Sequence, residues 1–193
     1  MLHTAAIPTS ARSTSAPRVP LTSPPTPQTM ESQIRLFFRS PLFAVVGAST
    51  DPSKFGHKVF AWYLSHSLPV TPINPSSRTT AVLSIPTIPS VRALKDPQNT
   101  SVSIITPPPV TLEVLREAAE VGVKRVWMQP GAWDRECVAF AKEKGMEAVV
   151  YGHEEELGHE GACVLVHGEA GMKAASCLRV YARVYAVGWK VWF

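Results

Sequence analysis

Residues 42–56 read Leu-Phe-Ala-Val-Val-Gly-Ala-Ser-Thr-Asp-Pro-Ser-Lys-Phe-Gly, a short apolar run that stops at one glycine and leads to another. An apolar run of this length followed by glycine is typical of a buried parallel strand that turns sharply into the next element. Residues 56–66 then carry apolar side chains at helical spacing. The stretch predicts a strand, a tight turn and a helix, which is the first half of a βαβ unit.

The same alternation of apolar runs and amphipathic segments continues to residue 151. Further strands are predicted at 70–73, 102–105, 125–128 and 148–151, and helices at 111–122 and 133–144. Thr111 is expected to cap the first of these helices, and Gly122 and Gly145 are expected to end them. Strands and helices at this spacing predict an α/β fold, a Rossmann-like doubly wound and mostly parallel sheet in a single domain.

The two ends of the chain differ from its middle. Residues 1–29 contain six prolines, ten Ser or Thr and no acid, which predicts a disordered extension. Residues 30–169 are expected to form the folded domain, with a last strand suggested at 162–166. Residues 170–193 are expected to be a carboxy-terminal extension, and the pattern over 176–193 does not assign that extension to a helix or a strand.

Charge and cysteine usage exclude several classes of protein. The formal net charge is +4, but residues 1–29 contribute +2 and residues 176–193 contribute +3, so the middle carries −1 and no basic surface for nucleic acid is expected. No apolar run approaches the roughly 20 residues that cross a bilayer. Three cysteines without metal-ligand spacing fit a reducing compartment. We expect a cytoplasmic protein; the arginines and hydroxyls of residues 1–29 leave the mitochondrial matrix as an alternative that the prolines weaken.

Four segments follow the predicted strands at the edge of the sheet where ligands bind, outside the carboxyl ends of parallel strands. They are residues 47–56, 74–77, 106–109 and 129–132. In the first, Gly47 allows the sharp turn, and Gly56 is expected to let a phosphate approach the amino end of the helix. Positions 49 and 52 are Ser and Pro, which breaks the G-x-G-x-x-G spacing of a dinucleotide loop. An ordinary strand-to-helix turn therefore stays open as the alternative.

The second segment distinguishes between nucleotide ligands. It reads Asn-Pro-Ser-Ser-Arg over residues 74–78 and contains no carboxylate. An NAD site normally places Asp or Glu there to bind the ribose hydroxyls. Two hydroxyls and an arginine suit a phosphate on the ribose instead. This favours CoA, which has a 3′-phosphate, or NADP, which has a 2′-phosphate, while an exposed turn with an unused arginine remains the alternative.

Four motifs together carry a family resemblance: FAVVGASTDPSKFGHKV (43–59), VTPINP (70–75), SIITPP (103–108) and VWMQPGA (126–132). Over about residues 33–169 the chain resembles the small stand-alone CoA-binding-domain proteins, which are similar to the amino-terminal domain of the succinyl-CoA synthetase alpha subunit. The resemblance implies a Rossmann-like fold that binds CoA, without a defined activity. It implies that the ligand-binding residues are Gly47, Ala48, Ser49, Thr50, Lys54, Phe55, Gly56, Asn74, Pro75, Ser76, Arg78, Thr106, Pro107 and Gln129.

One departure from the family pattern concerns the ribose phosphate. Many relatives place Lys or Arg directly after Asn-Pro, whereas this chain has Ser76 and Ser77 there and Arg78 one position later. The strength of the contact to the 3′-phosphate is therefore left open.

Several residues suggest catalysis but lack the pattern that it needs. His153 and His159 flank an acidic run without the H-E-x-x-H spacing of a zinc site, so a solvated loop and no metal are expected. Ser49 does not stand in G-x-S-x-G. Cys163 is expected to be a buried, inert thiol, and Trp127 is expected, with Trp133, to pack in the core.

The sequence therefore favours a CoA or acyl-CoA binding protein with no evident catalytic residues. A domain of about 140 residues leaves no room for the second domain that carries the phosphorylated histidine of succinyl-CoA synthetase, so a complete ligase is not expected. Two alternatives stay open. One is an NAD(P)-dependent oxidoreductase, although no Tyr-x-x-x-Lys pair follows the fourth strand; the other is a regulatory partner that senses CoA.

Overall fold

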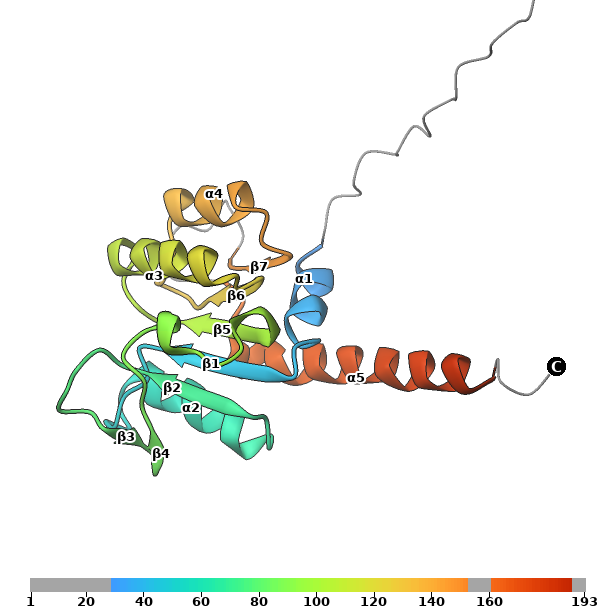
Figure 1. Ribbon diagram of the computed structural model, residues 1–193, viewed down its shortest axis with the longest axis horizontal. Helices are drawn as coiled ribbons and strands as arrows, with labels where there is room; N and C mark the ends of the chain where they lie inside the picture. The colour runs from blue at the N-terminus through green and yellow to red at the C-terminus, as the bar shows by residue number, and fades with distance from the viewer. Residues whose placement is uncertain (1–28, 153–160, 189–193) are drawn as a thin grey trace, which may run out of the picture.

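A single parallel sheet organises the structure, a computed structural model that describes residues 29–152 and 161–188, with side chains described through residue 176. The order of its strands is β2-β1-β5-β6-β7, and every ladder is parallel (Figure 1). The direction of winding reverses between β1 and β5, so their carboxyl ends mark the topological switch point. The strands are β1 Leu42–Val46, β2 Val70–Ile73, β5 Thr100–Ile104, β6 Arg125–Met128 and β7 Ala148–Val150.

Helices cover both faces of this sheet, which confirms the doubly wound α/β fold. One face carries α1 Met30–Phe37, α2 Phe55–Ser65 and α5 Val164–Gly188. The other carries α3 Pro108–Val121 and α4 Arg135–Glu143. The connection from β2 to β5 holds the short hairpin β3 Ala81–Val82 and β4 Ile85–Pro86, and the 3₁₀ turns η1 Val91–Ala93 and η2 Pro97–Asn99. None of the described helices is long and apolar enough to cross a membrane.

Alternate residues of the strands belong to two separate hydrophobic cores, one on each face of the sheet. In β6, Val126 and Met128 pack beneath α3 and α4, whereas Trp127 packs beneath α1 and α5. All three side chains are fully buried, and strands that are apolar on both faces are expected only in a sheet covered on both sides. The buried hydroxyl of Tyr63 lies 2.7 Å from Ser103 Oγ, so this polar group is satisfied within the core, where burial raises the pKa of Tyr63.

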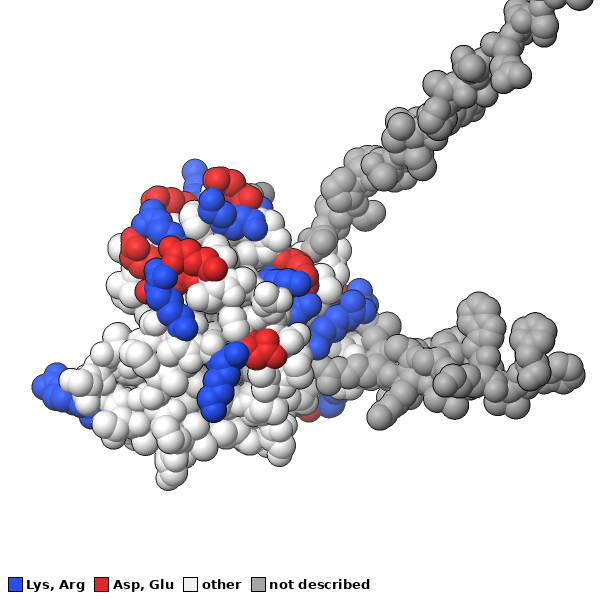
Figure 2. Space-filling model, in the orientation of Figure 1, with Lys and Arg blue, Asp and Glu red and all other residues white. Residues whose placement is uncertain are grey.

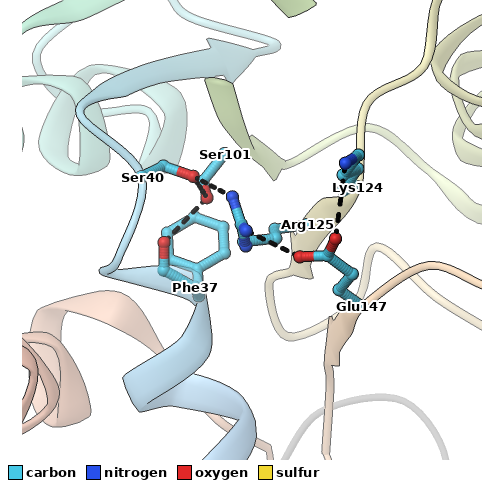
Figure 3. Close-up of polar contacts among 6 residues, drawn as sticks. All are labelled: Phe37, Ser40, Ser101, Lys124, Arg125 and Glu147. Atoms are coloured by element: carbon cyan, nitrogen blue, oxygen red, sulfur yellow. Dashed lines mark hydrogen bonds and ion pairs between the residues drawn. The ribbon is translucent and has the colours of Figure 1, made fainter. Parts of the chain in front are cut away.

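A polar cluster at the amino edge of the sheet holds α1 in place (Figure 3). Ser101 Oγ donates to the carbonyl oxygen of Phe37, the last residue of α1, over 2.7 Å, and also lies 2.7 Å from Ser40 Oγ. Arg125 donates to Ser40 Oγ at 2.9 Å and to Glu147 at 2.6 Å, and Lys124 pairs with the same carboxylate at 3.5 Å. The cluster ties α1 to β5, β6 and β7 at the edge opposite the switch point.

Several predicted boundaries differ from the structure. The helix predicted from residue 111 begins at Pro108, and its N-cap residue is Pro107. Proline suits the first turn because the N–H that it lacks has no partner there. Thr111 is therefore not the cap: it lies inside the helix and donates to the carbonyl oxygen of Thr106 at 2.8 Å. Gly122, with φ +84, ends the helix as predicted.

Other helices and strands begin or end one or two residues away from their predicted boundaries. The strand predicted at 102–105 spans 100–104, and the strand predicted at 148–151 ends at 150. The helix predicted from 133 starts at Arg135, because the side chain of Asp134 accepts from Cys137 N and caps it.

The strand suggested at 162–166 is wrong, because α5 starts inside that run. Two glycines allow α5 to approach the body closely. A Cβ at Gly168 would lie 2.6 Å from the ring of Trp62, and one at Gly171 would overlap Ile34. The helix continues without a break across residues 169 and 170, so we propose that the folded unit extends beyond residue 169.

The two residues that flank the segment 153–160, Gly152 and Gly161, are in contact. A Cβ at Gly161 would lie 2.8 Å from Cα of Gly152, so these two backbones are in direct contact. The predictions for residues 1–28, the polar loop at 153–160 and the end of the tail at 189–193 fall outside the described residues. Thr29 is described, and its side chain caps α1 by accepting from Ser32 N.

Candidate functional site

The loop that follows β1 lies directly over the switch point. Gly47 has φ +87, a conformation that favours glycine. Its N–H donates to the carbonyl oxygen of Ile73 at the end of β2, at 3.1 Å, and Ile105 N donates to Val46 O at 3.0 Å. The chain therefore leaves β1 sharply between the ends of β2 and β5, as the sequence predicted for Gly47.

Hydrogen bonds within this loop fix its shape. Asp51 Oδ1 accepts from Ser53 N at 2.9 Å and from Ser53 Oγ at 2.6 Å, and Asp51 N donates to Ser49 Oγ at 3.1 Å. The bond from the Ser53 hydroxyl is the main reason why the pKa of Asp51 is lowered. His57 Nδ1 lies 3.0 Å from the carbonyl oxygen of Ser49. The loop is thus preorganised, with Thr50 and Lys54 exposed on it.

The amino end of α2 is open to a ligand because no side chain caps it. Its N-cap residue is Lys54, which makes no capping hydrogen bond. The first N–H groups of a helix lack the usual partner four residues back, and together with the positive end of the dipole they favour an anion. In α2, His57 N donates to Lys54 O at 3.1 Å, so the N–H groups of Phe55 and Gly56 are the ones that a ligand would meet. The half-buried Phe55 and the buried Gly56 begin this first turn.

The structure explains the glycine at position 56 in a way that the sequence did not indicate. A Cβ at this position would overlap the carbonyl oxygen of Gly47 and lie 3.1 Å from its carbonyl carbon. The missing side chain therefore lets α2 pack against the backbone at the end of β1. This packing reason stands beside the predicted one, which was room for a phosphate; contact between Gly56 N–H and a ligand stays a prediction.

Asn74 joins the second predicted segment to the first. Its Nδ2 donates to the carbonyl oxygen of Ala48 at 2.8 Å, and its Oδ1 accepts from Ser76 N at 2.9 Å. One side chain thus sets the turn after β2 and holds the loop after β1. Pro75, Ser76 and Arg78 are exposed beside it. Arg78 N donates to Ser76 Oγ at 3.4 Å.

The other predicted residues lie farther along the same edge. Thr106 lies next to Gly47, and its Oγ1 is 2.8 Å from that of Thr111. Pro107 is exposed where α3 begins. The side chain of Gln129 is fully buried, and its Oε1 accepts from Val164 N at 2.9 Å, so its contact with a ligand stays a prediction. Sequence reasoning missed this contribution of α5, since a strand was suggested there.

Acidic and basic residues are unevenly distributed along the chain. Residues 52–95 contain no Asp or Glu but five cations. No ion pair is recorded within the described chain for Lys54, Lys58 or Arg78. On the face that Figure 2 shows, the acidic side chains gather mainly over α3 and α4. Residues 52–95, which include α2 and β2, therefore carry an excess of positive charge, and such an excess favours polyanionic ligands.

The described residues contain no obvious catalytic or metal-binding group. No three His, Cys, Asp or Glu side chains in residues 29–152 and 161–176 are grouped so that they could hold a metal ion. Burial raises the pKa of Cys137 to about 11 and also raises that of Cys163, so neither thiol is activated. Trp127 and Trp133 are buried in the core, as expected.

Comparison with known proteins supports the fold and identifies a family. A family model described as a CoA binding domain matches residues 42–152. A conserved hypothetical protein from Pyrococcus furiosus is 36% identical with a TM-score of 0.51, covering 55% of this chain and 90% of its own. A hypothetical protein from Pyrococcus horikoshii OT3 is 30% identical with a TM-score of 0.57, covering 68% and 90%. A Thermus thermophilus protein is 26% identical with a TM-score of 0.55, covering 62% and 89%. The comparison with curated proteins gave no match.

Proposed function

The chain belongs to the family of CoA-binding domains, and from that membership we propose that it binds CoA at the carboxyl edge of its sheet. The observation that carries this proposal is the uncapped amino end of α2, which lies over the switch point beside a preformed loop. The pyrophosphate would lie at this helix end, where N–H groups and the dipole stabilise negative charge. Gly47, Ala48, Ser49 and Thr50 would line it from the loop.

The residues after β2 support CoA over NAD. CoA carries a phosphate on its ribose, and the stretch from β2 to Lys95 offers cations and hydroxyls without a carboxylate. We propose that Ser76 and Arg78 contact the 3′-phosphate, while Asn74 and Pro75 shape the adenosine side of the site. No observation favours NADP in particular. The proposal is for binding and assigns no reaction.

Titration calorimetry with CoA, dephospho-CoA and NAD tests the proposal. CoA should bind most tightly, because dephospho-CoA lacks only the 3′-phosphate and one charge-assisted contact contributes about 1.5–3 kcal/mol, roughly 10- to 150-fold in affinity. Arg78→Ala should remove most of this difference by weakening CoA alone. Lys95→Ala is the matched control, since it removes one cation from the same acid-free stretch at the opposite edge of the sheet.

Two results would refute the assignment of the ligand. One is equal affinity for CoA and dephospho-CoA in the wild-type chain, which would mean that the ribose phosphate is not recognised. The other is NAD binding at least as tightly as CoA. An equal effect of Arg78→Ala and Lys95→Ala would show that only overall charge matters and that Arg78 makes no specific contact.

A further inference from the structure

A groove with a volume of about 270 Å³ runs between α1 and the first half of α5. Its walls are mainly apolar, and those from α5 are mostly small: the residues are Met30 and Ile34 of α1 and Val166, Ala170, Gly171 and Ala174 of α5. Val166 is 72% exposed, more than any other large apolar side chain that the structure describes. Apolar surface that lies open in this way is a candidate interaction surface.

The helix α5 continues past the part of the fold that holds its first half. The first half packs closely against α2 and α1, because Gly168 lies beside Trp62 and Gly171 beside Ile34. Residues 177–188, the distal half of α5, prolong the same helix to one side of the sheet and of α1 (Figure 1). Most of the stability of a helix in a protein comes from the packing of its apolar face. A surface that packs against the distal half would therefore stabilise it.

The distal half of α5 is amphipathic by its sequence. It reads Cys-Leu-Arg-Val-Tyr-Ala-Arg-Val-Tyr-Ala-Val-Gly. Successive residues of a helix are rotated by about 100°, so positions four apart lie on the same side and positions two apart lie on opposite sides. Tyr181 and Tyr185 therefore share one side of the helix, and Arg179 and Arg183 share the other. A helix of this kind packs its apolar side against another surface.

The groove and the distal half of α5 use the same side of the helix. Three groove residues precede three residues of the distal half by eleven positions each, almost three full turns: Val166, Ala170 and Ala174 precede Cys177, Tyr181 and Tyr185. The same six positions are also symmetric about a midpoint between residues 175 and 176, because 166 mirrors 185, 170 mirrors 181 and 174 mirrors 177. Two α5 helices that lie antiparallel about this midpoint would bring the tyrosines of one against the small side chains of the other.

We propose that two copies of this chain form a dimer in which the distal half of each α5 lies in the α1–α5 groove of the other copy. The arrangement is closed by a two-fold axis, because each copy supplies one groove and one occupant. Tyr181 and Tyr185 would pack over Ala170 and its neighbours, which leave room for large rings. Arg179 and Arg183 would face solvent on the far side of the helix.

The area that this arrangement buries suits a stable dimer. An aromatic side chain buries about 150–250 Å² when it is covered. Four tyrosines, two from each copy, would bury roughly 600–1,000 Å², and the groove walls beneath them would lose a comparable area. The total of roughly 1,200–2,000 Å² is that of a standard specific interface.

Charge also favours this occupant. Glu31 lines the groove, is exposed, and has no ion pair recorded within the described chain. Residues 177–188 contain two arginines and no acid. A basic helix is attracted to a groove that carries an unpaired carboxylate, whereas an acidic partner is repelled.

Light scattering after size-exclusion chromatography tests the dimer. The full chain at micromolar concentration should have twice the 21.0 kDa mass of one chain. Ala170→Asp places an unpaired carboxylate in each groove and should raise the Kd of the dimer roughly 100-fold or more. The matched control is Ser176→Asp, which adds the same side chain at an exposed position on another side of α5. It should leave the Kd within about threefold. Circular dichroism shows whether both variants are folded.

Cross-linking through the native cysteines tests the antiparallel register. The two Cys177 residues of the dimer would be three positions apart, about 4.5 Å along helices whose axes are about 8–10 Å apart. The two Cys163 residues would be 25 positions apart, about 37 Å. A short bis-maleimide should therefore give a covalent dimer with the full chain and with Cys163→Ser, and none with Cys177→Ser.

Several results would overturn the inference. A single-chain mass at high micromolar concentration would mean that the copies do not associate. A monomer that binds vesicles of anionic phospholipid but not of phosphatidylcholine would assign the distal half of α5 to a membrane surface. Equal effects of Ala170→Asp and Ser176→Asp would place the interface elsewhere. A dimer that is cross-linked through Cys163, or not through Cys177, would exclude this register. None of these measurements involves CoA, so the proposed function is tested separately.

Discussion

Gly56 couples the packing of α2 to the shape of the loop after β1. Any side chain at this position would overlap the carbonyl oxygen of Gly47, a backbone atom that cannot rotate away. We expect Gly56→Ala to destabilise the fold by about 3 kcal/mol, the upper end of the usual cost of overpacking. CoA binding should fall with it. Denaturant unfolding gives the free energy, and titration below the unfolding transition gives the affinity.

The control for Gly56 is a glycine with open space around it. Gly145 has φ +67, and a Cβ there would meet nothing within 4 Å. Gly145→Asn should therefore cost less than about 1 kcal/mol, because Asn tolerates this conformation. A Gly56→Ala protein that is as stable as Gly145→Asn would show that α2 does not depend on the close contact.

At the scale of elements, the polar cluster that attaches α1 contains two ion pairs, one partly buried and one exposed. Arg125 and Lys124 pair with the same carboxylate, that of Glu147, but only Arg125 also donates to the buried Ser40 (Figure 3). The Arg125 side chain is 18% exposed and that of Lys124 is 48% exposed. Arg125→Met should lower the free energy of unfolding by about 1–3 kcal/mol, since it removes the charge-assisted hydrogen bond to the buried Ser40 hydroxyl.

Lys124→Met should change stability by less than about 0.5 kcal/mol, as is usual for an exposed pair. Denaturant unfolding of the two variants side by side measures the difference. Equal losses would mean that the shared carboxylate carries the effect and that the bond to Ser40 contributes nothing to the attachment of α1.

The strands of the main sheet could be predicted because their apolar runs are short, compact and bounded by glycine or proline. The same rule failed at residues 162–166, since a short apolar run also fits one side of a buried helix. The helix at this position depends on contacts with residues that are distant in the sequence, because Gly168 and Gly171 let α5 pack closely against Trp62 and Ile34. The sequence did not indicate α1 or the β3–β4 hairpin, because such short elements depend on the contacts that they make with the rest of the fold.

The candidate site was predictable in position but not in its connections. The loops at residues 47–56 and 74–78 stand where parallel strands end, and that topology follows from the pattern. The bonds from Asn74 to Ala48 and from Gln129 to Val164 join residues that are 26 and 35 positions apart. No local pattern encodes such pairs. For the same reason, the packing role of Gly56 becomes visible only once α2 is seen against the end of β1.

At the scale of the whole molecule, the amino-terminal segment and the folded part can be tested separately. A chain that begins with Met followed by Thr29 should melt like the full chain and bind CoA equally well, since residues 1–28 carry no core pattern. A chain that begins at Met30 also loses the cap that Thr29 provides to Ser32 N. It should be less stable by about 1 kcal/mol.

Thermal melting and CoA titration of the full chain and both shortened chains provide the measurement. A fall of more than a few degrees for the chain that keeps Thr29 would contradict the prediction and show that residues 1–28 contact the folded part. Equal melting of the two shortened chains would show that the Thr29 cap adds nothing.

The contact between Gly152 and Gly161 makes this point of the fold a natural place for the insertion of foreign sequence. Because the two backbones meet there, a segment inserted between them would leave and re-enter the fold at the same point. Each doubling of the length of a flexible loop adds only about 0.6 kcal/mol to the entropy of closing it. A reporter peptide, or an entire second domain with adjacent termini, could thus be spliced between these glycines while β7 and α5 keep their places.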